Sequence, residues 1–212
     1  NYMAGSKAKA SSAYESAIDY FEAALRTLED SDWMTNHSLL QALHLTTMEA
    51  YYILGKYDQM KSIGDLLLRK ATSKMEYLQP HNVFIQSYIA RSKHLDLITY
   101  GLSILKEVGI KLHSRPSDTD ILVGLVQTKL KLIGKKAGYF EALPDMEDEH
   151  MALAINMMTS ISTASYHNFP KLFPIVILKS IRLSIRYGHS IDSIPFYGGY
   201  GTILCGVLGD YS

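Results

Sequence analysis

The stretch LHLTTMEAYYILGKYDQMKSIGDLLLR, at residues 43–69, decides the fold because its apolar residues recur at steps of three and four on both sides of one glycine. Residues at that spacing share one face of a helix. Two such faces are present, one on each side of the glycine. Before it the apolar residues are Leu43, Leu45, Met48, Tyr51, Tyr52 and Leu54, and after it the face consists of Tyr57, Met60, Ile63, Gly64, Leu67 and Leu68. Gly55 lacks a Cβ and tolerates the positive φ that often follows a helix. We therefore predict two antiparallel helices joined by a Gly-x-Tyr turn.

The next segment repeats this helix pair. Residues 81–109 align with the central stretch without a gap, so that Tyr51 falls on Tyr88 and Gly64 on Gly101, each 37 positions later. At the same offset Tyr57 falls on His94 and Leu68 on Leu105. The shared glycine predicts a close helix crossing in both copies. Because strand-like alternation persists nowhere in the chain, we predict an all-α fold built from antiparallel helix pairs.

Turn and capping residues divide the rest of the chain. We predict a loop at residues 29–37 and an extended linker at residues 110–115. We also predict a helix boundary at Gln79-Pro80, because proline disfavours helix in the residue before it. Ser117 and Asp120 form an S-x-x-D capping box. Further helices are predicted at residues 118–132, at 151–163, from Pro170 and Pro174 to Gly188, and at 193–208. The first of these presents Ile121, Leu122, Leu125, Leu130 and Leu132.

The repeats are predicted to form two regions, residues 1–109 and residues 110–212. The closing run Leu208-Gly209-Asp210-Tyr211 matches Leu54-Gly55-Lys56-Tyr57, so the chain is expected to stop where the second helix of another repeat would begin. Part of the apolar surface of helix 193–208 would then lack cover. We expect this end to self-associate or to be the most mobile part of the fold. Its apolar residues are Ile194, Phe196, Ile203, Leu204, Val207 and Leu208.

Composition excludes several classes of protein. Lys plus Arg and Asp plus Glu both number 21, so the formal net charge is zero, which argues against general binding of nucleic acid or anionic membranes. Cys205 is the only cysteine, and it provides no disulfide framework. The most apolar windows, at residues 172–177 and 203–208, are far shorter than a membrane span. A cytoplasmic location is the resulting expectation.

No residue pattern indicates catalysis, cofactor binding or a metal site. The eight histidines lack a ligand spacing such as HExxH, and His44, His94 and His167 are expected to make polar contacts between helices. The acidic run 145–150 is interpreted as the start of a helix, because it lacks the spacing of a calcium loop. Close helix packing explains Gly198, Gly199, Gly201 and Gly206 better than a phosphate loop does, and Lys135-Lys136 follows a helix end at Gly134. The 15 tyrosines are interpreted as half-buried scaffold, with an aromatic ligand groove as the alternative.

Several motifs resemble a known type of helical repeat. Tyr14, Ala17, Phe21 and Ala24 resemble the second helix of a tetratricopeptide repeat, and Gly55-Lys56-Tyr57 its inter-helix turn. Further motifs are residues 4–25, residues 112–117, Asn168-Phe169-Pro170, residues 186–190 and Gly209-Asp210-Tyr211. In this order they resemble the tetratricopeptide-like region that follows the AAA/P-loop ATPase module in large sensor kinases of bacteria and fungi. The resemblance implies an α-solenoid, an alpha-alpha superhelix of stacked helix pairs.

The resemblance also implies a function. Such parents join a serine/threonine-kinase-like domain, the ATPase, this helical region, a GAF domain and often a histidine kinase. ATP is then a cofactor of the parent, which is an ATP-dependent kinase, whereas the present chain is not an enzyme and binds no cofactor. Its expected role is a non-catalytic interaction and signal-relay segment whose partners are the parent's ATPase and kinase domains or another protein. The alternative is a sensor that binds a small molecule or peptide in the concave groove of the solenoid.

Overall fold

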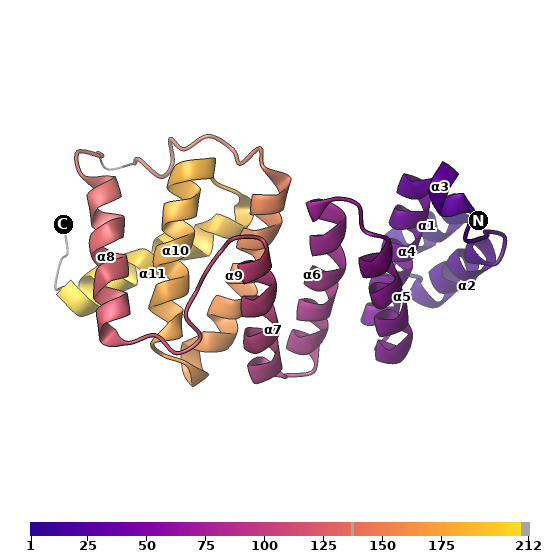
Figure 1. Ribbon diagram of the computed structural model, residues 1–212, viewed down its shortest axis with the longest axis horizontal. Coiled ribbons are helices and arrows are strands. Elements are labelled where there is room, and N and C mark those ends of the chain that lie inside the picture. Colours follow the sequence, from indigo (N-terminus) through magenta and orange to yellow (C-terminus); the bar gives the residue numbers. More distant parts are fainter. Residues whose placement is uncertain (137, 209–212) are drawn as a thin grey trace. The chain divides into compact units, whose positions relative to one another are not determined.

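The computed structural model describes residues 1–136 and 138–208, and all of the regular structure in these ranges is helical. Eleven α-helices and two short helical turns occur there without any β-strand, so the predicted all-α class is confirmed. A single isolated bridge joins the backbones of Asp145 and His189. The chain forms two compact units, residues 1–87 and 88–212, and each is described by itself (Figure 1).

The first unit contains the N-terminal helices. They are α1 (Tyr2–Ala10), α2 (Tyr14–Leu25), α3 (Asp32–Thr35), α4 (His37–Ile53), α5 (Tyr57–Lys70) and most of α6 (Lys74–Ala90). Helix α1 packs on α2, α2 on α4, and α4 on both α3 and α5. Short α3 lies within the loop predicted at residues 29–37 and buries Trp33, the one tryptophan of the chain. The core of the unit includes Phe21, Leu40, Leu43, Met48, Met60, Leu67 and Leu78.

The predicted pair at residues 43–69 exists as α4 and α5. Gly55 has φ +69° in the turn between them, and the Lys56 backbone N–H donates to Tyr51 O at 2.9 Å. This bond spans five residues and closes the end of α4 as in a Schellman motif. Leu54 was expected on the inward face but is only partly buried, because α4 ends at Ile53 and Leu54 belongs to the turn.

Gly64 allows a close helix crossing, as predicted. A Cβ at this position would lie 2.7 Å from Met48 Cε and even closer to the ring of Phe84. Because Gly64 has no side chain, α5 can pack closely at this position against α4 and against the part of α6 that belongs to the first unit.

The predicted helix boundary at Gln79-Pro80 is wrong, because Pro80 lies inside α6. Proline lacks the N–H that would bond to the carbonyl four residues earlier, here Glu76 O. Gln41 on α4 supplies a substitute, since its side-chain amide donates to Glu76 O at 3.5 Å. Tertiary packing thus satisfies the carbonyl that Pro80 leaves without its helical partner.

The offset of 37 residues recurs in the helix bounds. Helices α4 and α6 both have 17 residues, and α5 and α7 (His94–Glu107) both have 14 residues. Each later helix begins 37 positions after the earlier one. The turns match as well, because Ser92 has φ +54° and the Lys93 N–H donates to Tyr88 O at 2.9 Å. The self-match therefore extends from sequence to local structure.

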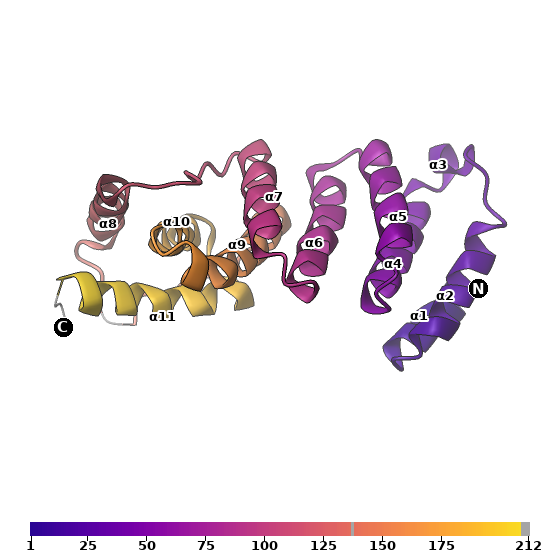
Figure 2. The same ribbon diagram turned by 90° about the horizontal axis from the view of Figure 1, so that it is seen from below.

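The second unit is arranged around helix α10 (Leu172–Tyr187). It contains α7, α8 (Asp118–Leu132), α9 (Glu149–Asn168), α10 (Leu172–Tyr187) and α11 (Ile194–Ile203), with a 3₁₀ turn at Ile191–Ser193 and a π-helical turn at Leu204–Leu208. Helix α10 packs on α8, α9 and α11, while α7 packs on α9 (Figures 1 and 2). The core of the second unit includes Ile155, Met157, Met158, Ile161, Val176, Leu178 and Ile181.

Helix starts in this unit follow the sequence closely. Ser117 and Asp120 form the predicted capping box, with the Asp120 N–H donating to Ser117 Oγ at 3.2 Å and the Ser117 N–H donating to Asp120 Oδ2 at 2.8 Å. Helix α8 occupies the predicted range 118–132. Two of its apolar residues, Leu122 and Leu130, are nevertheless exposed, because α8 buries the opposite side against α10.

The C-terminal helix region differs from its prediction. The range 193–208 is split between α11 and the π-helical turn, and Phe196 and Ile203 are buried in the unit whereas Ile194 is 56% exposed. Gly188 has φ +94° directly after α10, as predicted, while Gly209 lies outside the described residues. Over the described ranges, every helix is too short or too polar to span a bilayer.

Candidate functional site

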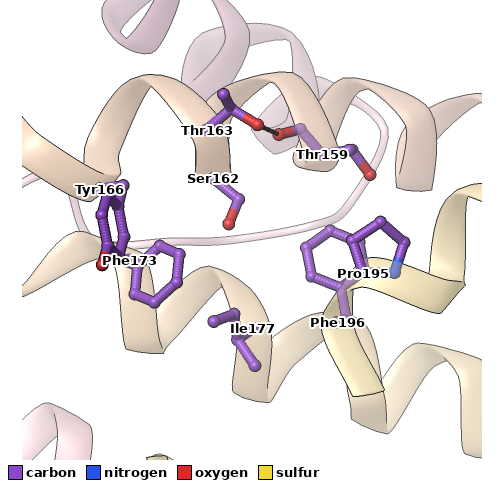
Figure 3. A pocket seen from close by; sticks show the side chains of 8 residues that line it. All are labelled: Thr159, Ser162, Thr163, Tyr166, Phe173, Ile177, Pro195 and Phe196. Atoms are coloured by element: carbon purple, nitrogen blue, oxygen red, sulfur yellow. Dashed lines mark hydrogen bonds between the residues drawn. The ribbon is translucent and has the colours of Figure 1, made fainter. Parts of the chain in front are cut away.

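A pocket opens between α9, α10 and α11 of the second unit (Figure 3). Its volume is about 320 Å³, which lies at the lower end of the range for small-molecule sites. The lining residues come from all three helices: Thr159, Ser162, Thr163 and Tyr166 from α9, Phe173 and Ile177 from α10, and Pro195 and Phe196 from α11.

The four lining residues of α9 lie on one face of that helix. They occur at steps of three, one and three residues, which at 3.6 residues per turn keeps them within one stripe. Three carry hydroxyl groups on short side chains and the fourth is Tyr166, so the stripe is small and polar over two turns and aromatic at its end. The helix α9 extends to Asn168, beyond the predicted end at residue 163, and only this extension brings Tyr166 onto the stripe.

Two hydroxyl groups of the stripe have partners in the protein. Thr159 Oγ1 donates to Ile155 O at 3.2 Å or to Asp192 O at 3.1 Å, so it also ties α9 to the turn before α11. Thr163 Oγ1 donates to Thr159 O at 3.0 Å, the bond drawn in Figure 3. Both groups are therefore engaged in holding the helices.

The hydroxyl of Ser162 differs from these two. Ser162 is only 8% exposed, and its Oγ makes no hydrogen bond to any residue that the structure describes. Figure 3 shows this oxygen directed into the space between Phe173, Ile177 and Phe196. A buried hydroxyl is stabilised by a hydrogen-bond partner, which a ligand or a water molecule in the pocket would provide.

Aromatic rings form the walls. Tyr166 and Phe173 meet edge to face at 5.0 Å between centroids with an angle of 72°. Phe196 is 1% exposed and closes the inner end, whereas Tyr166 is 57% exposed and stands at the mouth. The pocket is thus apolar in depth and has its polar groups along one side.

This chemistry suits binding rather than reaction. Among the residues that the structure describes in the lining there is no charged side chain, no histidine and no cysteine. A serine hydroxyl is a weak nucleophile unless a general base lies beside it. The groups present can hold an apolar molecule that also donates or accepts one hydrogen bond at Ser162.

His44 and His94 do not make the polar contacts between helices that were expected of them. His44 is buried, but its Nδ1 donates to Leu40 O at 2.8 Å within the same helix, and its ring packs on Trp33 at 5.1 Å. Burial lowers the pKa of His44, although the bond to Leu40 O acts in the opposite direction. His94 is exposed at the start of α7, and the side chain of His167 lies outside the described residues.

The acidic run 145–150 starts a helix, as interpreted from the sequence. Asp148 is the N-cap of α9 and accepts a hydrogen bond from the Met151 N–H at 3.0 Å. Asp145 lies 3.4 Å from His189 Nε2. Over the residues with described positions, no cluster of three or more His, Cys, Asp or Glu side chains is close enough to hold a metal ion.

The glycine cluster was only partly interpreted correctly. Gly199 permits close packing, because a Cβ there would lie 2.6 Å from Ile177 Cδ1. Nothing lies within 4 Å of a Cβ built at Gly198, Gly201 or Gly206, so helix packing does not explain these three. Lys135 follows Gly134, as expected after a helix end, and its Nζ lies 4.6 Å from the ring of Tyr139.

The sequence did not point to the pocket. Three of its lining residues, Ser162, Thr163 and Tyr166, carry no motif, and their only signal is the spacing of short polar side chains along α9. Comparison with known proteins adds no further assignment, since no family model, no curated protein and no solved structure matches this chain.

Proposed function

We propose that this chain is a non-catalytic helical-repeat segment that binds other protein domains and relays a signal within a larger ATPase and sensor-kinase protein. The observation that carries this proposal is the recurrence of one helix–turn–helix unit, with helices of 17 and 14 residues, at an offset of 37. Such recurrence is typical of repeat proteins, which use extended surfaces to bind partners.

In this proposal the helices form antiparallel pairs stacked as a tetratricopeptide-like solenoid in the cytoplasm. ATP is bound by the parent's ATPase domain, and the segment couples the nucleotide state of that domain to the kinase. Support comes from the motifs that resemble this region and from the uncharged lining of the pocket, which provides no acid–base pair. Each repeat contacts mainly its neighbours, so a change at one end can pass along the array.

Hydrogen exchange tests the relay. In the full-length protein, exchange of residues 1–208 would be compared with ADP and with a non-hydrolysable ATP analogue. We expect nucleotide-dependent protection in these helices, and a substitution of the phosphate-loop lysine in the parent's ATPase domain should abolish it. Identical exchange in both nucleotide states would contradict the relay.

The alternative function is a sensor of small molecules, and the pocket of Figure 3 is the observation that favours it. Phenol is a suitable probe because it combines an aromatic ring with one hydroxyl, whereas benzene has the ring alone. We expect phenol to raise the melting temperature more than benzene does. The variant Ser162→Ala should remove this difference, and Ser162→Leu should prevent the stabilisation by both. If phenol stabilised the native protein, Ser162→Ala and Ser162→Leu equally, this pocket would be excluded as the binding site.

A further inference from the structure

The helix α8 carries a second apolar face that the described residues of the second unit do not cover. Four side chains on it are between 49% and 62% exposed: Leu122, Val123, Val126 and Leu130. At 3.6 residues per turn they fall within about 100° of arc, so they form one stripe along the helix. The buried residues of α8, which include Gly124, Leu125 and Thr128, lie on the other side against α10. We call the four exposed residues the α8 stripe.

A groove runs beside this stripe between α8 and α10. Two adjoining hollows of about 290 and 420 Å³ share Lys179 and Arg182 in their linings. Val123 borders one hollow and Leu130 the other, so the groove and the α8 stripe form one continuous surface. The linker after α7 contributes Lys111, Leu112 and His113 to one end.

The groove is strongly cationic although the chain as a whole has no net charge. Its lining includes five Lys or Arg side chains: Lys111, Lys131, Lys179, Arg182 and Arg186. Among the described lining residues only Asp120 is acidic, and it accepts hydrogen bonds from the Ser117 backbone and hydroxyl and lies 3.2 Å from His113. Within the described ranges, none of the five cations is paired with a carboxylate.

Two of these cations are partly withdrawn from water. Arg182 donates to Gly124 O at 2.9 Å and to Thr128 Oγ1 at 2.8 Å, which are neutral acceptors on α8. Lys179 is half-buried beside it. Burial, and then the neighbouring Arg182 charge, lower the pKa of Lys179. An arriving carboxylate would offset both effects, because a nearby opposite charge favours the protonated form.

We propose that the α8–α10 groove and the α8 stripe bind an amphipathic helix of a partner protein that presents apolar residues on one face and Asp or Glu along the adjoining edge. This proposal rests on the interaction role proposed above and names the chemistry of one partner. The stripe spans a little more than two turns, or about 12 Å, which fits the recognition of a helix through residues spaced three and four apart. Its aliphatic side chains offer no aromatic surface on which the bases of a nucleic acid could stack.

A binding experiment with the whole chain tests this. The probe is a fluorescein-labelled synthetic helical peptide of about 18 residues, with leucines three and four apart and glutamates beside them, and the control peptide has the same composition in scrambled order. Fluorescence anisotropy measures both affinities. We expect the helical peptide to bind more tightly, and the double variant Lys131→Glu/Lys179→Glu to weaken it by about tenfold or more.

The matched control is Lys7→Glu/Lys74→Glu, which makes the same change in net charge at exposed lysines of the first unit. It should leave the affinity within about twofold, since neither lysine lines the groove. Val126→Ser/Leu130→Ser tests the stripe and should also weaken binding. A peptide with lysine in place of glutamate should have a higher affinity for the Lys131→Glu/Lys179→Glu variant than for the native protein.

Three outcomes would overturn the proposal: equal binding of the scrambled peptide, equal loss of affinity in Lys131→Glu/Lys179→Glu and in the control Lys7→Glu/Lys74→Glu, or displacement by single-stranded DNA at the same charge concentration. Circular dichroism of each variant verifies that it is folded. The nucleotide-dependent exchange of the full-length protein is measured without any peptide. If that response persists while peptide binding fails, only the chemistry of the partner is wrong.

Discussion

At the scale of single residues, the same turn joins two consecutive helices at three places, with different residues at its positive-φ position. Ser12, Gly55 and Ser92 have φ of 62°, 69° and 54°. In each turn the following backbone N–H donates to a carbonyl five residues earlier, at 2.9 Å. Glycine adopts positive φ at little cost, whereas a residue with a Cβ does so at a cost of about 1 kcal/mol.

The first prediction follows from these turns. Ser92→Gly is expected to increase the free energy of unfolding by about 0.5–1 kcal/mol, and Gly55→Ala to decrease it by about 1 kcal/mol. Urea denaturation of both variants measures the change. Ser62→Gly, on the exposed side of α5, is the control and should be destabilising, because glycine inside a helix costs about 1 kcal/mol. A loss of stability in Ser92→Gly would contradict the strain.

The second prediction concerns pH. Burial lowers the pKa of His44 below its ordinary value of 6.5, so the unfolded chain binds a proton more readily than the folded one. The first unit should therefore have its full stability above pH 6.5 and lose part of it as the pH falls below that value. Trp33, 5.1 Å from the His44 ring, provides the fluorescence signal for urea titrations at pH 7 and 5.

The variant His44→Gln should remove most of this loss. The control is His37→Gln, since His37 also contacts Trp33, at 5.4 Å, and pairs with Glu76 at 3.0 Å. Burial alone would raise the pKa of Glu76, but hydrogen bonds from Thr72 and His37 outweigh it and lower the pKa below 4.5, so the stability that Glu76 contributes is lost only below that pH. If the His44→Gln variant lost as much stability between pH 7 and 5 as the native protein does, the loss would come from the titration of another group.

The third prediction is a coupling between two residues of the first unit. Gln41→Met removes the donor to Glu76 O and is expected to destabilise the protein by about 1 kcal/mol. In the background Pro80→Ala the helix regains the N–H at position 80, so the same change should cost little. The coupling energy of the double-mutant cycle measures this. Additive losses would show that Gln41 does not compensate for the proline.

At the scale of elements, the sequence predicted those features that neighbouring residues determine. The capping box of Ser117 and Asp120 set the start of α8, and the 37-residue self-match predicted α6 and α7. The boundary at Pro80 was wrong because its solution lies on another helix, at Gln41. The exposure of Leu130 was likewise not predictable, since the spacing of apolar residues identifies a face but not the neighbour that covers it.

The fourth prediction compares two helical glycines. Gly64→Ala would place a Cβ against Phe84 and Met48, whereas Gly198 is exposed and has open space around the same position. Alanine favours helix over glycine by about 1 kcal/mol. Gly198→Ala should therefore be neutral or stabilising, while Gly64→Ala should be destabilising by about 1–3 kcal/mol because the core must move. Thermal unfolding of both variants gives the comparison, and equal behaviour would contradict the close crossing at Gly64.

At the scale of the whole molecule, the binding surfaces could not be predicted from the sequence. The pocket of Figure 3 requires α9, α10 and α11 together, and the cationic groove requires α8 and α10. Zero net charge indicated the absence of a general field but gave no information about where the charges lie. Both surfaces share α10, which packs on three helices of the second unit, so the integrity of this helix determines whether either surface exists.

The last prediction concerns how stability is distributed between the two units. In the proposed repeat architecture each element stabilises mainly its neighbours, so a defect in α10 should stay local. Ile181→Ala, at a fully buried position of α10, is expected to cost about 2–5 kcal/mol in the second unit. Trp33 fluorescence reports the first unit alone, whereas far-UV circular dichroism reports helix throughout. Ile181→Ala should shift part of the circular dichroism transition to lower urea and leave the Trp33 midpoint unchanged. Phe21→Leu, in the first core, should lower the Trp33 midpoint. If Ile181→Ala lowered both signals equally, the chain would unfold as one cooperative body, and the continuous helix α6, which crosses the division at residue 87, would be the element that couples the two units.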